Sequence, residues 1–183
     1  MKTITPSKTK GFTLIELLLV IAILGILVVM GLASFTSSLQ KGRDSKRKND
    51  VRQIGLALES YFADKGTYPL GNAGVIVGCH TPVESCTWGS AFTDDVTIYM
   101  TQLPADSPSD AKKYYYVSTD GTYFQLYARL ENAKDNDIVH NAEQQMRVFT
   151  NTNCGNGTTT IHCNYGMSST NKAVTDGQVT AYE

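Results

Sequence analysis

The chain has 183 residues with a formal net charge of −1, from 16 basic and 17 acidic residues. Residues 1–10 hold three lysines and no acid, residues 41–52 have a net charge of +4, and residues 53–183 hold seven basic against fourteen acidic residues. An acidic C-terminal part excludes a general polyanion-binding surface there, so we do not expect nucleic acid as a partner.

A long apolar run follows the basic N-terminus. Residues 17–40 carry no charged side chain, and the run is long enough to cross a bilayer as a helix of ~20 residues. Glu16 stands just inside its start, where a carboxylate would cost ~2.5 to 3.5 kcal/mol if it reached the bilayer centre. The lysines before the run favour a cytoplasmic N-terminus and an exported C-terminal part. A cleaved signal peptide or a plain anchor are alternatives, but neither explains Glu16.

The residues around Glu16 carry a family resemblance. The segment Lys10-Gly11-Phe12-Thr13-Leu14-Ile15-Glu16-Leu17 resembles the processing site of class III signal sequences in type IV pilins and type II secretion pseudopilins. The resemblance implies that a prepilin peptidase cuts after Gly11 and methylates the new amino group of Phe12. Glu16 then becomes the fifth residue of the mature chain, the position at which the family has glutamate.

The new amino group of Phe12 and the carboxylate of Glu16 would both lie among apolar groups. Each offsets the desolvation cost of the other if they meet, within one chain or between neighbouring subunits. We therefore expect Glu16 to act in assembly.

The sequence predicts an α+β fold with a long N-terminal helix packed on a small antiparallel sheet, the architecture that the resemblance implies. We expect a leader at 1–11, a transmembrane and filament-core helix at 12–35, and a head at 36–183 that includes a stem helix at 36–63. An apolar stripe at helical spacing should face the sheet: Val51, Ile54, Leu58 and Tyr61, with Ala57 and Phe62 at its margins. Gly66 favours a helix cap, and Pro69 blocks continuation.

The sheet is predicted from alternation after the stem. Residues 70–92 are expected to be loop-rich, and residues 93–101 to form a short helix. Residues 114–117, the turn signal Asp120-Gly121 and the alternating run 123–130 predict a hairpin whose apolar face covers the stem. In the tail, 138–183, short strands are expected near 146–149, 158–161 and 178–182, at the variable surface of the protein.

Four cysteines form two close pairs, Cys79 with Cys86 and Cys154 with Cys163. On the exported side they are expected to be oxidised, and local pairing is the simplest of three connectivities. Zinc is the alternative, because a histidine adjoins one cysteine of each pair, but the gaps of six and eight residues differ from the usual two to four.

The polar loop 131–137 is a candidate calcium site. Asp135 and Asp137 offer hard oxygen ligands, and pseudopilins that resemble this chain use a loop in this region for calcium. Plain loop polarity is the alternative, and the spacing does not match an EF-hand. No other cofactor is expected.

No phosphate loop, nucleophile elbow or catalytic metal motif occurs in the chain, so we do not expect an enzyme. The basic segment 41–52 is expected to be a solvated helix face or to pair with acids on neighbouring heads. We expect a single-pass subunit of the cytoplasmic membrane that forms a homo-oligomeric pilus or pseudopilus outside the cytoplasm, with prepilin peptidase and an assembly platform as partners. The rival is a membrane-anchored extracytoplasmic binding domain that does not polymerise.

Overall fold

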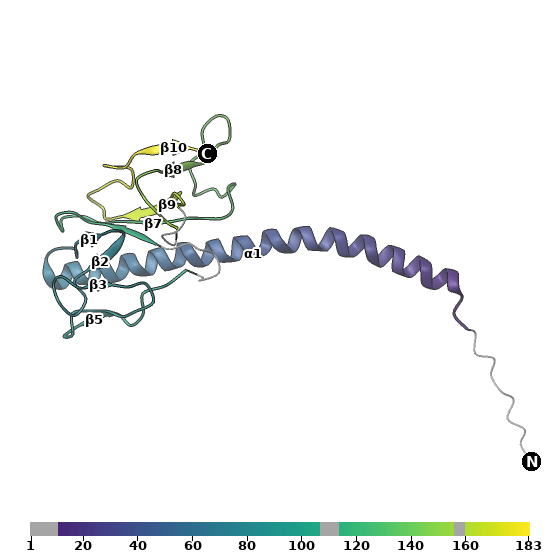
Figure 1. The fold of residues 1–183 in the computed structure, drawn as a ribbon, viewed down its shortest axis with the longest axis horizontal. Helices are drawn as coiled ribbons and strands as arrows, with labels where there is room; N and C mark the ends of the chain where they lie inside the picture. Colours follow the sequence, from purple (N-terminus) through teal and green to yellow (C-terminus); the bar gives the residue numbers. More distant parts are fainter. Residues whose placement is uncertain (1–10, 107–113, 156–159) are drawn as a thin grey trace, which may run out of the picture. The chain divides into compact units, whose positions relative to one another are not determined.

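The computed structural model describes residues 11–106, 114–155 and 160–183, and for residues 29–34 the helical backbone alone. Helix α1 (Leu14–Lys65) comes first, and the strands that follow are short and antiparallel (Figure 1). The chain divides into two compact units, which we call the N-terminal unit (Met1–Leu39) and the head unit (Gln40–Glu183). The α+β class predicted from the sequence is confirmed, whereas a single long helix through both units stays a prediction.

The N-terminal unit is helical from Leu14 onward. The large apolar side chains between Leu17 and Val28 each expose between 41% and 64% of their surface. Within the residues that the structure describes, no helix is both long and apolar enough to span a membrane.

The second part of α1 supplies the core of the head unit. Val51, Ile54 and Leu58 are fully buried and Ala57 is 6% exposed, so the predicted apolar stripe is confirmed. The helix ends at Lys65, and Gly66 follows with a φ of +73°. Its N–H donates to the carbonyl of Phe62 at 2.8 Å, and glycine takes this left-handed conformation at little cost, which ends the helix.

A three-stranded sheet packs on this stripe. Strand β7 (Gln125–Ala128) pairs antiparallel with β6 (Tyr115–Val117) and with β9 (Tyr165–Ser168). Phe124, Leu126 and Ala128 are buried in one cluster with the helix, as the alternation predicted.

The predicted two-residue turn between β6 and β7 is wrong in length. The connection runs over residues 118–124, because it pairs with the chain that leaves the helix. The N–H of Gly71 donates to the carbonyl of Ser118 at 2.8 Å, and the N–H of Tyr68 donates to the carbonyl of Gly121 at 2.7 Å. Gly121 still marks the bend, with a φ of +74°.

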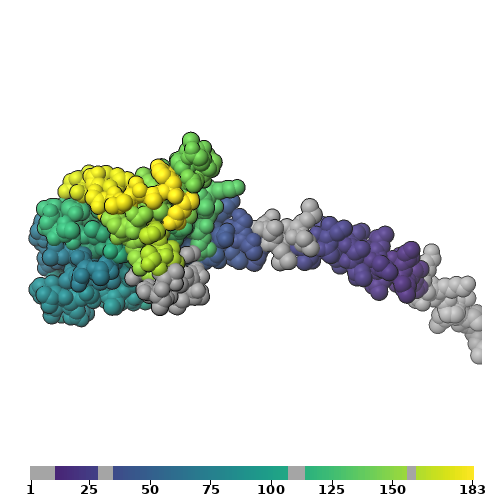
Figure 2. All heavy atoms as spheres, turned by 45° about the horizontal axis from the view of Figure 1, so that its top comes forward, coloured from purple at the N-terminus to yellow at the C-terminus, as the bar shows by residue number. Residues whose placement is uncertain are grey.

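The tail covers the second face of β7, the one that does not pack on the helix. Tyr127 is fully buried, and its hydroxyl donates to the carbonyl of Val174 at 2.6 Å. Gln125 is 1% exposed and donates to the carbonyls of Ala173 and Asp176. Figure 2 shows the tail, in green to yellow, over one face of the head. The tail therefore belongs to the head's packing as well as to its surface.

The tail also forms its own strand pair. The strands predicted near 146–149 and 178–182 are confirmed as β8 (Arg147–Phe149) and β10 (Thr180–Tyr182), and the structure pairs them antiparallel. Strand β9 was not predicted. Half of the strand expected at 158–161 lies outside the described residues, and Thr160 and Ile161, which are described, belong to no strand.

The region expected to be loop-rich contains a second small sheet, formed by β1 (Gly71–Asn72), β2 (Val75–Val77) and β3 (Ser85–Cys86). The helix predicted at 93–101 is wrong, because β4 (Phe92–Thr93) and β5 (Ile98–Met100) form a hairpin there. The carboxylate of Asp94 accepts the N–H groups of Val96 and Thr97, at 3.1 and 2.6 Å. Asp95 follows with a φ of 68°, a left-handed conformation that a continuing right-handed helix does not contain, so the chain turns here.

Candidate functional site

The start of α1 is held by a reciprocal pair of side chains. Glu16 Oε2 accepts the backbone N–H of Thr13 at 2.9 Å and its hydroxyl at 2.7 Å, and Thr13 Oγ1 accepts the N–H of Glu16 at 3.3 Å. This is a capping box, which satisfies two backbone donors that a helix start would otherwise leave free. The sequence signal for it, Thr-x-x-Glu, was overlooked when Glu16 was assigned to assembly alone.

The residues at the predicted cleavage point lie directly before this capping box. Gly11 and Phe12 precede the helix and are exposed, and Phe12 exposes 77% of its surface. Cleavage after Gly11 and methylation at Phe12 stay predictions. The Glu16 carboxylate, predicted to pair with the Phe12 amine, bonds Thr13, the residue next to Phe12.

In the head unit, the basic segment of α1 holds a buried ion cluster around Arg47, which is 1% exposed. Its guanidinium lies 2.9 Å from Asp44 Oδ1, 2.6 Å from Asp106 Oδ2 and 2.7 Å from Glu131 Oε1. Burial by itself lowers the pKa of Arg47, but the hydrogen bonds that its guanidinium donates to Asp106 and Glu131 outweigh burial and raise that pKa. The cluster therefore joins three segments of the head through one charged side chain.

Asp44 completes this cluster from the helix side. Its carboxylate accepts the backbone N–H groups of Glu131 and Asn132, at 2.9 and 2.8 Å. Arg43, which is more exposed, binds the same Glu131. The segment expected to be solvated, or to pair with other heads, thus pairs partly with its own head.

A second buried contact lies one turn further along the stem. The hydroxyl of Tyr114 donates to Asp50 Oδ2 at 2.7 Å, and both side chains are buried. Burial first, and then this hydrogen bond, raise the pKa of Tyr114. Sequence reasoning missed this contact, because nothing in the local pattern relates residues 64 positions apart.

The calcium candidates Asp135 and Asp137 lie together at Lys48 of α1. The Lys48 ammonium is 2.5 Å from Asp135 Oδ1 and 2.5 Å from Asp137 Oδ2. Calcium takes six to eight oxygen ligands, whereas in the described part of the chain no three acids, histidines or cysteines gather as a metal site. Calcium binding stays a prediction, and it requires that Lys48 leave these carboxylates.

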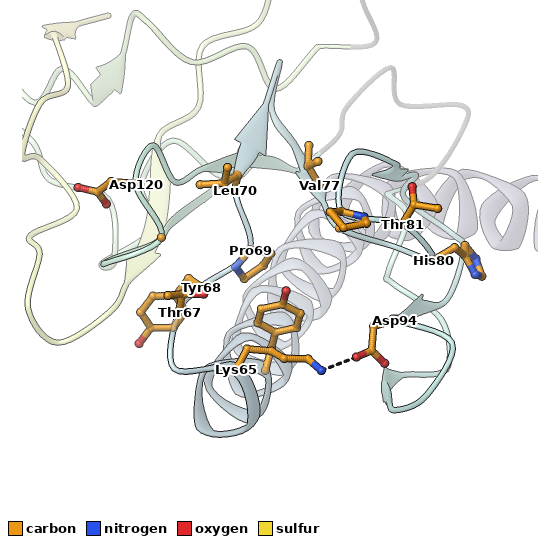
Figure 3. A pocket seen from close by; sticks show the side chains of 14 residues that line it. Lys65, Thr67, Tyr68, Pro69, Leu70, Val77, His80, Thr81, Asp94 and Asp120 are labelled. Carbon is orange, nitrogen blue, oxygen red and sulfur yellow. Dashed lines mark ion pairs between the residues drawn. The ribbon is translucent and has the colours of Figure 1, made fainter.

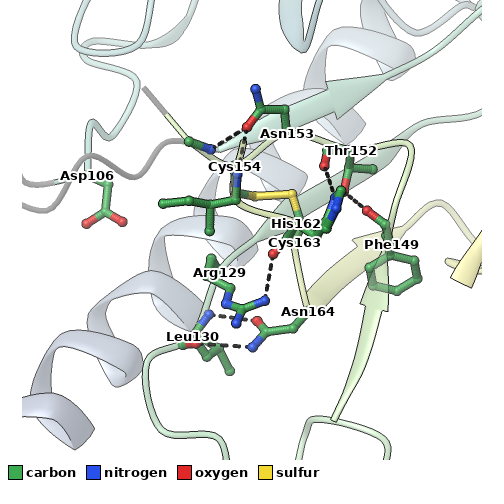
Figure 4. The surroundings of a disulfide bond; sticks show 12 residues. Asp106, Arg129, Leu130, Phe149, Thr152, Asn153, Cys154, His162, Cys163 and Asn164 are labelled. Carbon is green, nitrogen blue, oxygen red and sulfur yellow. Dashed lines mark hydrogen bonds between the residues drawn. A yellow bond between two sulfur atoms is a disulfide. The ribbon is translucent and has the colours of Figure 1, made fainter. Parts of the chain in front are cut away.

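Disulfide bonds join Cys79 to Cys86 and Cys154 to Cys163, so local pairing is confirmed. Zinc at these cysteines is excluded, because each thiol is consumed. Figure 4 shows the second disulfide beside Asn164, whose side chain bonds both backbone groups of Leu130. The disulfide thereby lies where the tail joins the end of β7.

A cleft of about 510 Å³ lies at the C-terminal end of α1 in the head unit (Figure 3). Its wall includes Tyr61, Lys65 and Pro69, with Asp94 and Asp120 at its sides. Lys65 Nζ binds Asp94 Oδ2 at 2.7 Å, so these two charges satisfy each other. No sequence pattern predicts this cleft, because its walls come from distant segments of the chain.

Comparison with known proteins agrees with the N-terminal motif. Residues 6–32 match the prokaryotic N-terminal methylation motif. The chain is 30% identical over 131 residues to the type II secretion system core protein G of Pseudomonas aeruginosa, which covers 69% of this chain and 89% of that protein. No solved structure gave a significant match.

Shorter matches reach the pilins themselves. A fimbrial protein of Eikenella corrodens is 41% identical over 64 residues, 35% of this chain and 42% of that protein. The type IV major pilin of Myxococcus xanthus is 34% identical over 61 residues, 33% of this chain and 28% of that protein. These relatives are structural proteins and not enzymes. The chain belongs to the family of type IV pilins and type II secretion pseudopilins.

Proposed function

We propose that this chain is the structural subunit of a type II secretion pseudopilus or a type IV pilus. Prepilin peptidase cuts it after Gly11 and methylates Phe12, and it polymerises through its N-terminal helix on an assembly platform. Before assembly it is a single-pass protein of the cytoplasmic membrane with its head outside the cytoplasm. Afterwards it is part of a periplasmic or extracellular filament.

One observation carries this proposal: the apolar side chains of the N-terminal helix are uncovered. From Leu17 to Val28 they expose 41% or more of their surface. A helix that is apolar on all sides is stable when lipid or other helices surround it. The same surface therefore serves as a membrane anchor first and as a filament core after assembly.

The helix start supports the same proposal. The Thr13–Glu16 capping box holds a carboxylate beside the residue that becomes the new N-terminus. A methylated amine at Phe12 is a cation that a nearby anion stabilises in apolar surroundings. In the filament, Glu16 then binds the amine of Phe12, of its own chain or of a neighbour.

The head supports contacts between subunits through charge. Lys41, Lys46 and Arg52 are exposed on α1, and in the part of the chain that the structure describes they form no ion pair. The rest of the head is acidic. These three cations are the groups that a neighbouring head would pair with, in a contact that weakens with salt.

A pseudopilus is favoured over a pilus by the extent of the match. The similarity to core protein G runs over 131 residues, whereas the two pilin matches run over 64 and 61. The match to the Pseudomonas aeruginosa secretion protein thus extends over more of this chain than either pilin match does.

The test is mass spectrometry of the mature N-terminus together with a Glu16→Ala variant. We expect a chain that begins at N-methylated Phe12, and a Glu16→Ala variant that enters the membrane normally but forms few or no filaments. Glu143→Ala, which changes an exposed glutamate of the head, is the matched control and should assemble normally. Unchanged filament yield in Glu16→Ala would remove the proposed role of this carboxylate.

The rival function is an anchored extracytoplasmic binding domain, and the cleft near Tyr61 is the observation in its favour. It predicts a chain that keeps Met1, and no filaments under any condition. A mature N-terminus at Phe12 rules it out.

A further inference from the structure

Lys48 occupies an unusual position between two carboxylates of one loop. It lies on α1, whereas Asp135 and Asp137 lie in the loop that leaves β7 for β8. The three side chains expose 25%, 16% and 56% of their surface, so the contact is half-buried. The Lys48 ammonium also lies 5.9 Å from the centre of the Tyr165 ring, within the range of a cation–π contact.

The loop itself is shaped around this contact. Asp135 Oδ1 accepts the backbone N–H of Asp137 at 3.0 Å as well as the Lys48 ammonium. The N–H of Ile138 donates to the carbonyl of Asp135 at 3.1 Å, and Ile138 is buried. The two acids thus converge on one point, at which the structure places an ammonium.

The charges agree with this geometry. Partial burial favours the neutral amine of Lys48, yet the hydrogen bonds that Lys48 donates to the two aspartates raise its pKa. Partial burial likewise favours the neutral carboxyl of Asp135, yet the hydrogen bond from Lys48 lowers the pKa of Asp135.

We propose that Lys48 is the resident cation of this loop: its ammonium neutralises Asp135 and Asp137 and fastens the loop to α1, in the place that a divalent cation would take. The head then needs no calcium to hold the loop. This inference is independent of polymerisation, since it concerns one folded head.

The test compares the full-length chain and its variants in detergent micelles, in millimolar calcium or in chelator, by thermal unfolding. The wild-type midpoint should be the same in both. Lys48→Met should lower the midpoint in chelator by roughly 2–4 °C, and calcium should restore it by binding the vacated carboxylates. The added substitutions Asp135→Asn and Asp137→Asn should abolish that restoration.

Two controls separate this effect from loss of any lysine. Lys46→Met removes an exposed lysine of the same helix and should change neither the midpoint nor its response to calcium. Lys48→Arg keeps a cation and should remain indifferent to calcium. The proposal is overturned if calcium stabilises the wild type, if Lys48→Met unfolds like Lys46→Met, or if Lys48→Met is weakened but ignores calcium.

Discussion

Replacing Arg47 by methionine should destabilise the head far more than the same change at Arg43. Both arginines lie on α1 and both bind Glu131, but Arg47 is 1% exposed and Arg43 is 43% exposed. Removing one partner of a buried ion pair costs about 3–5 kcal/mol, because the remaining charges stay buried without compensation. An exposed pair contributes about 0.2–1 kcal/mol.

The assay is urea and thermal unfolding of the full-length variants in detergent, followed by circular dichroism. For a chain of this length, 1 kcal/mol shifts the midpoint by about 2–4 °C. Arg47→Met should therefore lower it by about 6–20 °C, and Arg43→Met by less than about 4 °C. Equal shifts would refute the reasoning that burial decides the cost.

A second variant tests where the cost arises. If the loss in Arg47→Met comes from uncompensated carboxylates, then Asp106→Asn and Glu131→Gln added to it should recover part of the stability, since they neutralise two partners of Arg47. No recovery would mean that the cost lies in lost packing of the arginine side chain.

Two further predictions concern the head. The hydrogen bond from Lys65, and after it the bond from the N–H of Thr97, lower the pKa of Asp94 below its ordinary value of 3.8. The ionised carboxylate therefore stabilises the fold above pH 3.8, and this stabilisation is lost as the pH falls through the lower pKa of the folded state. The difference in unfolding midpoint between pH 7 and strong acid should therefore be smaller in Asp94→Asn than in the wild type. Gly166→Ala should cost about 1–3 kcal/mol in urea unfolding, because a Cβ there would lie 2.7 Å from the Tyr127 ring and 3.0 Å from the Leu126 carbonyl. Gly42→Ala, where a Cβ meets nothing within 4 Å, should instead stabilise the helix by up to about 1 kcal/mol, and the opposite order would contradict the structure.

The sequence predicted those parts of the fold that one segment determines alone. The stem stripe from Val51 to Tyr61 follows from helical periodicity, and the glycine cap at Gly66 follows from its backbone freedom. The local disulfides follow from short spacing. Each of these signals lies within a few residues, so no knowledge of the rest of the chain is needed to read it.

The errors arise where a distant segment decides. Alternation along β7 separates the face of Leu126 from that of Tyr127, but it gave no cover for the second face, which the tail around Val174 supplies together with a carbonyl for the Tyr127 hydroxyl. The helix predicted at 93–101 is wrong because β4 pairs with β5, and Asp95 between them takes a left-handed φ of 68°. Periodicity reports which faces of an element differ, but it does not report what covers each face.

The basic segment 41–52 shows the same limit and has a consequence for assembly. Charge counting treated its six basic residues as one surface, yet Arg43, Arg47 and Lys48 bind acids of their own head. Among contacts within the described residues, Lys41, Lys46 and Arg52 form no ion pair, and they are exposed on α1. Arg43, Arg47 and Lys48 bind acidic side chains of loop 131–137. These ion pairs hold the loop on α1, and they also neutralise acidic charge that the loop could otherwise offer to a neighbouring subunit. Contacts between subunits through this segment are therefore expected to depend on these three cations and on acids elsewhere in the head.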